Sequence, residues 1–303
     1  MDHTFTRSAE FLVEDSPRPF PWLNVILFAL TCVTTTVVGT ALMAEFNDAF
    51  PESITSFLVS IVFAPSMLIS GLPFSIAIMT ILMAHEMGHY LTCRYYGIDA
   101  TLPYFIPWFT GTMGAFIRIR SPIPNRASLL EVGIAGPIAG FVVAVPAFIL
   151  ALVYSKLMVL PEHYFGFGEP LVFKGLAALL HKTPPPGMDL HLHPIGLAAW
   201  FGFFATALNL LPVGQLDGGH VSYALLGRWH RKISQAIVFV LIPLGIFYWQ
   251  GWLAWTTVLL FIGTRHPMTL DETAPLCPRH RILGWTGVAM LGLCFTPMPF
   301  YIH

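Results

Sequence analysis

The residues with the clearest chemical potential are two histidines and a glutamate in the sequence HEMGH. His85 and His89 stand four residues apart, so on an α-helix their side chains share one face and can reach the same metal ion. Glu86 is turned about 100° round the helix from His85, beside the metal but not bound to it. A carboxylate in that place can take a proton from water and return it later. The pattern therefore predicts a zinc centre that performs hydrolysis.

The surroundings of this motif are apolar. Residues 74–84 (FSIAIMTILMA) contain no charged side chain, so a helix through them would enter a lipid bilayer before it reached His85. Ionisable groups inside a membrane span are costly and by default mark a functional site. The alternative is a pair of histidines that reach toward water from a helix end. In that case Glu86 would be a buried carboxylate without a role.

The composition indicates a membrane protein. Of the 303 residues, 55% are hydrophobic and only 10% are charged, and the mean hydropathy is +0.70. Soluble domains carry about 25% charged residues. The net charge of −1 provides no basic field for nucleic acid. The four cysteines form no CxxC pair, so we expect neither a disulfide framework nor a cysteine zinc site.

The apolar runs predict an all-α polytopic protein with about six transmembrane helices. Uncharged or nearly uncharged stretches that could span lie at residues 23–44, 72–96, 129–155, 194–211, 233–249 and 282–299. We interpret 54–71 as an interfacial or re-entrant helix, with a full span as the alternative, and 252–263 as a tilted or partial span. Residues 1–22 are too polar and acidic for a signal peptide and are predicted to form a tail.

Residues 99–120 interrupt this helical pattern. Pro103 and Pro107 exclude a continuous helix, and partial alternation over 115–120 suggests a short membrane-associated β segment. Non-helical backbone at membrane depth is tolerated only within protein or beside a cavity. An exposed strand edge next to the histidine helix could pair with an unwound peptide. A plain surface hairpin is the alternative.

A further acid stands in the sequence VGQLDGG. Pro212 ends the preceding apolar helix, and a new helix is expected from about Gly219 to Leu226. Asp217 therefore lies at a break between two helical segments, and the residues around it in the sequence are mostly apolar. Broken helices at membrane depth commonly line binding sites. The alternative is that Asp217 only caps the next helix.

Two other patterns have structural explanations. Gly136 and Gly140 in AGPIAG have the GxxxG spacing that allows a neighbouring helix to approach closely. Residues 156–192 form a polar loop, and the histidines in or beside it are interpreted as solvated rather than as metal ligands. These histidines are His181, His191 and His193.

HEMGH in one apolar helix and NLLPVGQLDG some 120 residues later together resemble the site-2 protease family of zinc intramembrane metalloproteases. The family pattern is HExxH on one transmembrane helix and NxxPxxxLDG on another. The similarity covers residues 72–226, and it is greatest to the branch that lacks a PDZ insertion. It implies a three-helix catalytic core with one Zn²⁺ per chain. The implied metal ligands are His85, His89 and Asp217, with Glu86 as the base.

The same resemblance implies how substrate is held. Asn209 matches the first residue of the second motif and is expected to contact the substrate backbone. The extended segment around residues 111–116 is expected to hold an extended substrate. The substrate-binding residues implied there are Gly114, Ala115 and Phe116.

These features predict a metalloendopeptidase that cleaves membrane-anchored proteins within or near their transmembrane segments, in regulated intramembrane proteolysis. Its predicted partners are such a substrate and the lipid bilayer; the oligomeric state is open. A membrane transporter is one alternative, but its acids would recur along several helices or in a repeat. An inactive scaffold with an intramembrane metal site is the other, and the intact HEMGH argues against it.

Basic residues predict the orientation of this multi-pass protein. If residues 23–44 span once and residues 54–71 do not, 12 of the 15 lysine and arginine residues fall on the same side of the membrane as the N-terminus. Only Lys156, Lys174 and Lys182 fall on the opposite side. By the positive-inside rule that side is extracytoplasmic. The N-terminus and HEMGH then lie toward the cytoplasm, in the cell membrane if the source is bacterial. The predicted units are the cytoplasmic tail 1–22, the first span with its re-entrant segment 23–71, the catalytic core 72–226 with its extracytoplasmic loop 156–192, and the C-terminal helices 227–303.

Overall fold

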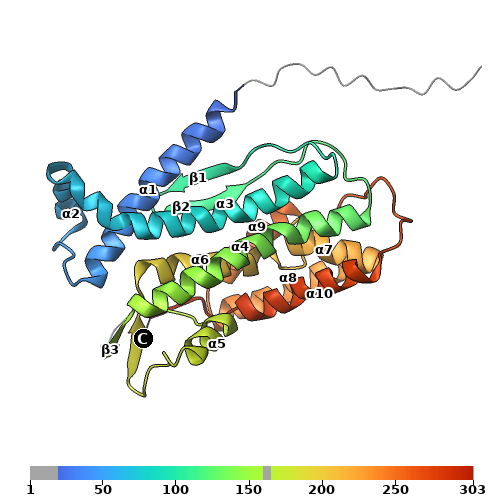
Figure 1. Cartoon of the computed structure of the whole chain (residues 1–303). Helices are drawn as coiled ribbons and strands as arrows, with labels where there is room; N and C mark the ends of the chain where they lie inside the picture. The colour runs from blue at the N-terminus through green and yellow to red at the C-terminus, as the bar shows by residue number, and fades with distance from the viewer. Residues whose placement is uncertain (1–19, 160–164, 303) are drawn as a thin grey trace, which may run out of the picture.

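The computed structural model describes residues 20–159 and 165–302, and it is mostly helical (Figure 1). The α-helices are α1 (Trp22–Phe46), α2 (Ile54–Phe63), α3 (Leu72–Tyr95), α4 (Arg126–Tyr154), α5 (Leu171–Leu179), α6 (Pro194–Asn209), α7 (Asp217–Leu226), α8 (His230–Phe247), α9 (Gly251–Ile262) and α10 (Pro278–Cys294). Two 3₁₀ helices join them, η1 (Pro65–Gly71) and η2 (Gly227–Trp229).

Three two-stranded antiparallel sheets complete the described fold. β1 (Tyr104–Trp108) pairs with β2 (Gly111–Phe116), β3 (Lys156–Val159) with β5 (Met188–His191), and β4 (Phe165–Phe167) with β6 (Phe300–Ile302). The first sheet is the β segment expected within residues 99–120. The other two lie in and beside the predicted polar loop, which therefore has more regular structure than its composition indicates.

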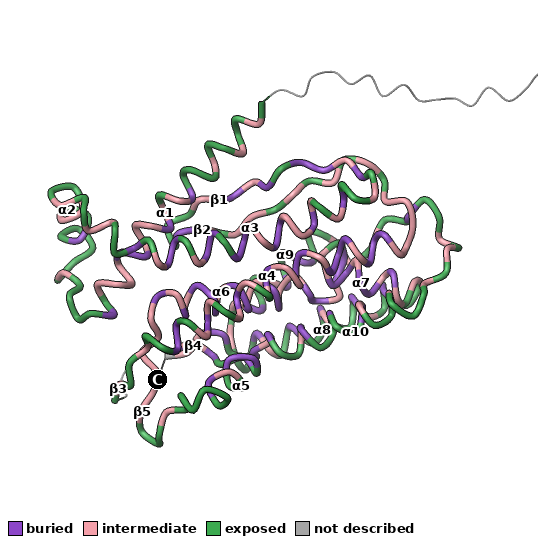
Figure 2. Tube along the Cα trace, viewed as in Figure 1, coloured by how far each residue is buried: buried purple, intermediate pink, exposed green. Residues whose placement is uncertain are grey.

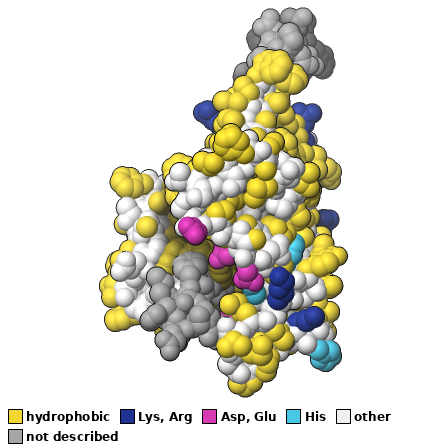
Figure 3. All heavy atoms as spheres, turned by 90° about the vertical axis from the view of Figure 1, so that its left-hand side faces the viewer, with side chains coloured by type: hydrophobic (Ala, Val, Ile, Leu, Met, Phe, Trp, Pro, Cys, Tyr) yellow, Lys and Arg dark blue, Asp and Glu magenta, His cyan; other side chains and the backbone are white. Residues whose placement is uncertain are grey.

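Four helical stretches are long and apolar enough to cross a membrane. They are α1, η1 with α3, α4, and α7 with α8. The 16-residue α6 and the 12-residue α9 are apolar but short. Large apolar side chains also remain exposed, with Phe63 at 84% and Phe261 at 87%. Hydrophobic side chains cover much of the end face in Figure 3. A surface of this kind is suited to lipid rather than to water.

Helix α4 is the centre of the packing. It lies beside α3 on one side and beside α6 and α7 on the other (Figure 1). Buried residues concentrate where these helices face one another (Figure 2). Phe148 of α4 packs with Trp200 and Phe203 of α6, and all three side chains are fully buried. This close-packed interface holds α3 and α7 at fixed positions against the same helix.

The local sequence explains where these helices begin and end. Asn125 starts α4 through a reciprocal capping box with Ser128. Pro212, which has no backbone N–H, follows α6, and Gly214 then turns the chain at a φ of +54°. The prediction that the next helix starts near Gly219 was two residues late, because α7 begins at Asp217.

The predicted strand over residues 115–120 was displaced along the chain. β2 covers Gly111–Phe116, and beyond it only Ile119 forms an isolated bridge, to Ala100. The ladder ends where Tyr104 pairs with Phe116, since the next residue of the partner segment is Pro103. Proline has no N–H to continue the ladder.

Candidate metal centre

Three potential ligand atoms converge between α3 and α7. Nε2 of His85 lies 3.2 Å from Oδ2 of Asp217 and 3.2 Å from Nε2 of His89. The distance from His89 Nε2 to the same Asp217 oxygen is 3.3 Å. Ligands about 2.0 Å from a tetrahedral zinc ion are about 3.3 Å apart, so this triangle has the size that zinc requires. Two imidazoles and a carboxylate are also a donor set that zinc accepts.

Hydrogen bonding orients the His89 ring for this role. Its Nδ1 lies 2.7 Å from the backbone carbonyl oxygen of Val132 in α4. A carbonyl only accepts, so Nδ1 carries the proton and the lone pair is on Nε2, the atom that faces Asp217. Helix α4 thus selects the tautomer of His89 that can bind a metal.

Glycines of α4 provide the space for the site. A methyl group on Gly136 would overlap Nε2 of His89, and one on Gly140 would lie 3.2 Å from Nδ1 of His85. A methyl group on Gly133 would come within 2.7 Å of Cβ of His220. The GxxxG pair therefore allows close approach, as its spacing indicates, and the groups that approach are the two motif histidines.

A cavity of about 230 Å³ opens beside the triangle. Glu86 lines it, is only 6% exposed, and is not one of the three convergent ligands. Ile117, which comes just after β2, lines the cavity together with Glu86. A base held beside a metal triangle and open to a cavity is placed to move a proton to or from a bound molecule.

The predicted substrate-binding residues divide into two groups. Ala115, Phe116 and Asn209 line the cavity, and Nδ2 of Asn209 lies 3.4 Å from Nε2 of His85. Gly114 does not line it; with a φ of +109° it instead bends β2. Within the part of the chain that the structure describes, β2 pairs only with β1, and its second edge is on the cavity side.

His266 is the site residue that sequence reasoning missed. It follows α9, and its Nε2 lies 2.6 Å from Nδ1 of His220, which lines the cavity. His266 Nδ1 lies 2.6 Å from the carbonyl oxygen of Pro267 and must donate to it. Burial lowers the pKa of His266, so its ring is neutral at pH 7 and its Nε2 accepts from His220. His220 is then left with a lone pair on Nε2. The only signal in the sequence was the tripeptide Arg265-His266-Pro267, which resembles the branch of the site-2 protease family without a PDZ insertion.

The interpretation of the loop histidines as solvated was wrong for His193. This residue is the N-cap of α6, and its Nδ1 accepts a hydrogen bond from the backbone N–H of Ile195 at 3.3 Å. Its ring also contacts the ring of Phe46 at 5.2 Å between centroids. Within residues 20–159 and 165–302, the one group of histidine, cysteine and acidic side chains that could hold a metal is His85, His89 and Asp217.

Known proteins are similar to this chain in sequence. The profile of Peptidase family M50 matches residues 73–248. "Probable zinc metalloprotease EGY2, chloroplastic" of Oryza sativa subsp. indica is 34% identical over an alignment of 240 residues that covers 73% of this chain and 41% of that protein. "Probable zinc metalloprotease EGY1, chloroplastic" of Arabidopsis thaliana is 28% identical over an alignment of 295 residues that covers 92% of this chain and 53% of that protein. No solved structure matches the chain.

The chain thus spans about half or less of the length of these relatives. The family profile nevertheless covers more than half of the chain and contains every member of the metal triangle as well as Glu86. The chain belongs to peptidase family M50, the site-2 proteases.

Proposed function

We propose that this chain is a zinc-dependent endopeptidase that hydrolyses peptide bonds within or near the transmembrane segments of membrane-anchored proteins, in regulated intramembrane proteolysis. The observation that carries the proposal is the triangle of His85, His89 and Asp217, of zinc-site dimensions, with Glu86 beside it. The triangle is built on apolar helices, where three ionisable groups have no structural reason to meet. This convergence on one point disfavours a transporter.

The roles of the residues follow from their places. Zinc bound by the triangle would act as a Lewis acid toward the scissile carbonyl and would make water nucleophilic at neutral pH. Glu86 takes the proton of the attacking water and passes it to the nitrogen of the leaving amine. Asn209, beside His85, donates its Nδ2 hydrogen to the substrate backbone. His220 offers an acceptor at Nε2 from a different wall of the cavity.

The free edge of β2 receives the substrate as an added strand. A transmembrane helix must unwind before it can be cleaved, and a strand edge replaces the hydrogen bonds that it loses. Both the N–H and the C=O of Arg118 bond to Thr101, on the β1 side. Backbone N–H and C=O groups point to alternate edges along an extended chain, so those of residues 115 and 117 point to the cavity side. The backbone of Ile117 interacts with the Glu86 carboxylate, which leaves Ala115 as the main pairing position.

This strand addition is testable at one residue. Ala115→Pro removes the N–H on the cavity side and should lower cleavage at least tenfold, whereas zinc content should stay unchanged. Ala115→Val keeps the N–H and is the matched control. If the proline variant cleaves as the valine variant does, β2 does not pair with substrate through Ala115.

The membrane arrangement is the second part of the proposal. In it α3, α4 and the α6–α7 pair form the three-helix catalytic core. The helices α1, α3, α4, α6, α8 and α10 cross the bilayer, and α9, as a tilted or partial span, returns the chain from the end of α8 to the side where α10 begins. The C-terminus of α3 and the N-termini of α4 and α10 meet at the same end of the molecule (Figure 1). Arg94, Arg126 and Arg281 lie near these ends. We assign this basic end and the N-terminus to the cytoplasmic side. A reporter fused after His303 should be extracytoplasmic, and a cytoplasmic reporter would refute the orientation.

The proteolytic function itself is tested with Glu86→Gln. The glutamine keeps the size of the side chain but cannot accept the proton. Membrane-protein fragments released by cells that express wild type should disappear with the variant, while its zinc content remains that of wild type. Fragments that persist at a normal rate with Glu86→Gln would contradict the assignment.

A further inference from the structure

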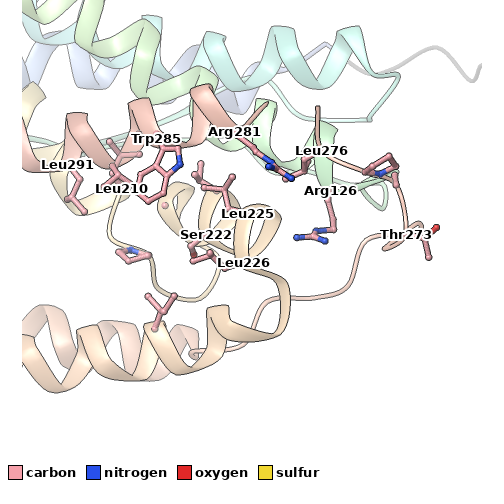
Figure 4. Close-up of a pocket in the computed structure, with 18 residues that line it drawn as sticks. Arg126, Leu210, Ser222, Leu225, Leu226, Thr273, Leu276, Arg281, Trp285 and Leu291 are labelled. Carbon is pink, nitrogen blue, oxygen red and sulfur yellow. The ribbon is translucent and has the colours of Figure 1, made fainter. Parts of the chain in front are cut away.

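A second cavity, of about 540 Å³, lies along a face of α7 other than the one that carries Asp217 and His220 (Figure 4). It is more than twice the size of the cavity at the metal centre. Helices α7, α8 and α10 and the segment 273–276 form its walls. Leu210, Pro212 and Gly218 of the second sequence motif also line it. Nothing in the proteolytic mechanism uses this cavity.

One wall is an apolar stripe along α10. Trp285, Val288 and Leu291 follow Arg281 at intervals of four, three and three residues, the spacing of one helix face. Trp285 is 66% exposed and Val288 is 50% exposed, so protein does not fill the space beside them. From Arg281 to Leu291 the helix rises about 15 Å. Half of a hydrocarbon core of about 30 Å is also about 15 Å, so the stripe has the depth of one lipid leaflet.

The end of the cavity at the start of α10 is positively charged. The guanidinium groups of Arg126 and Arg281 lie at one end in Figure 4, and Leu210 and Leu291 lie at the other. Arg126 donates from Nη2 to the carbonyl oxygen of Ala224 near the end of α7. Its Nε is buried and has no hydrogen-bond partner among the described residues. Neither arginine has a carboxylate within ion-pair distance in the described part of the chain.

The two acids next to the segment 273–276 are already engaged. Oδ1 of Asp271 accepts from the backbone N–H and the hydroxyl group of Thr273. Oε1 of Glu272 accepts from Tyr223 Oη at 3.0 Å and from the Thr269 backbone N–H at 2.7 Å. Two cations therefore stand at the mouth of an apolar groove without a bonded anion. A groove of this kind, between transmembrane helices at their basic end, matches an anionic lipid in both charge and polarity.

We propose that this cavity binds one anionic membrane lipid, with its phosphate between Arg126 and Arg281 and one acyl chain along α10. The size of the cavity favours this occupant over a protein segment. A helix is about 10–12 Å wide, so a length of 15 Å would fill more than about 1,000 Å³. The cavity has only about half of that volume. The bound chain lies against Leu210 and Pro212 and braces the junction that carries Asp217.

Native mass spectrometry of the full chain, released from mixed micelles, tests the site. The probes are dioleoylphosphatidylglycerol, which is anionic, and dioleoylphosphatidylcholine, which has the same chains and no net charge. Wild type should retain one phosphatidylglycerol molecule per chain, bound more tightly than phosphatidylcholine. Arg281→Gln should weaken phosphatidylglycerol binding by about five- to tenfold. The readout is a mass, so it is independent of the proposed proteolysis.

Two variants control for charge and for fold. Arg279→Gln removes a cation two residues away on α10 that lines a different cavity, with Tyr96 and Glu131, and it should bind lipid as wild type does. Val288→Trp leaves both arginines in place but fills the apolar groove, so it should also lose the lipid. The proposal is overturned if Arg281→Gln binds as Arg279→Gln does, if Val288→Trp retains the lipid, or if the two lipids bind equally.

Discussion

Gly136 of α4 lies against the imidazole of His89 so closely that a single added methyl group would overlap Nε2, the ring nitrogen that faces Asp217. The sequence shows this glycine only as half of a helix-packing motif. In the structure the packing partner is a potential metal ligand, so the helix interface and the metal centre are the same feature. The close packing of α4 against α3 therefore helps to fix the position of His89 in the site.

Gly136→Ala should consequently abolish zinc binding. The methyl group must displace His89 or push α4 away from α3, and both changes open the ligand triangle. Gly140→Ala should have a milder effect, because its methyl group would be 3.2 Å from His85. Metal analysis of purified protein measures both. Gly292→Ala on α10, where nothing lies within 4 Å, is the control and should keep its zinc. Full zinc occupancy in Gly136→Ala would contradict the predicted overlap.

Asp217→Ala should lose metal and activity together. The rival interpretation, that Asp217 only caps α7, has little support in the local geometry. Leu216 is the N-cap, and no side chain caps the helix. A capping role would cost about 1 kcal/mol of stability and leave zinc in place. The proposed ligand role instead removes one of three protein ligands. Zinc content and melting temperature, measured on the same purified sample, separate the two explanations.

His266→Ala should lower kcat with little change in KM or zinc content. The substitution removes the acceptor that holds the proton on Nδ1 of His220, so the His220 ring can reorient or change tautomer. We expect a loss of about tenfold or more, typical of orienting partners. His266→Gln keeps an acceptor on a side chain of similar reach and should recover part of the rate. Equal rates for the alanine variant and wild type would exclude a positioning role.

Much of this site was predictable because residue spacing and a proline fix the local geometry of its two motifs. The i, i+4 spacing puts His85 and His89 on one face of any helix, and Pro212 forces a chain break just before Asp217. The approximate course of α1, α3 and α4 followed from runs of more than 20 residues with few or no charged side chains, which are long enough to cross a bilayer. Those predictions depend only on backbone geometry and on the length of apolar chain that a bilayer requires.

What the sequence did not reveal depends on tertiary contacts. His266 lies 46 residues after His220, and no periodicity connects the two. The position of β2 was missed because a strand of six residues is set by its partner, here interrupted at Pro103, more than by its own alternation. The strands β3 and β5 were missed because they pair across about 30 intervening residues, a separation that no local pattern reveals.

The histidine cap at the start of α6 should make the stability of the protein depend on pH. His193 caps this helix by accepting at Nδ1, so the cap requires an unprotonated nitrogen. Burial, with a smaller effect from the positive charge of Lys156, lowers the pKa of His193 below its ordinary value of about 6.5. As the pH falls, His193 is therefore protonated at a higher pH in the unfolded chain than in the folded one. The stability contributed by this cap is fully present above pH 6.5 and is lost as the pH falls through the lower pKa of the folded state.

Melting temperatures of the full chain in detergent, measured from pH 7.5 to pH 5, test this expectation. His193→Asn provides a good N-cap that does not titrate. The wild type should therefore lose more stability on acidification than the variant, and the two curves should converge toward pH 7.5. His181→Asn, at an exposed position beyond α5, controls for the general loss of one histidine and should follow the wild-type curve. If the wild type and His193→Asn lose stability in parallel, the cap does not titrate in this range.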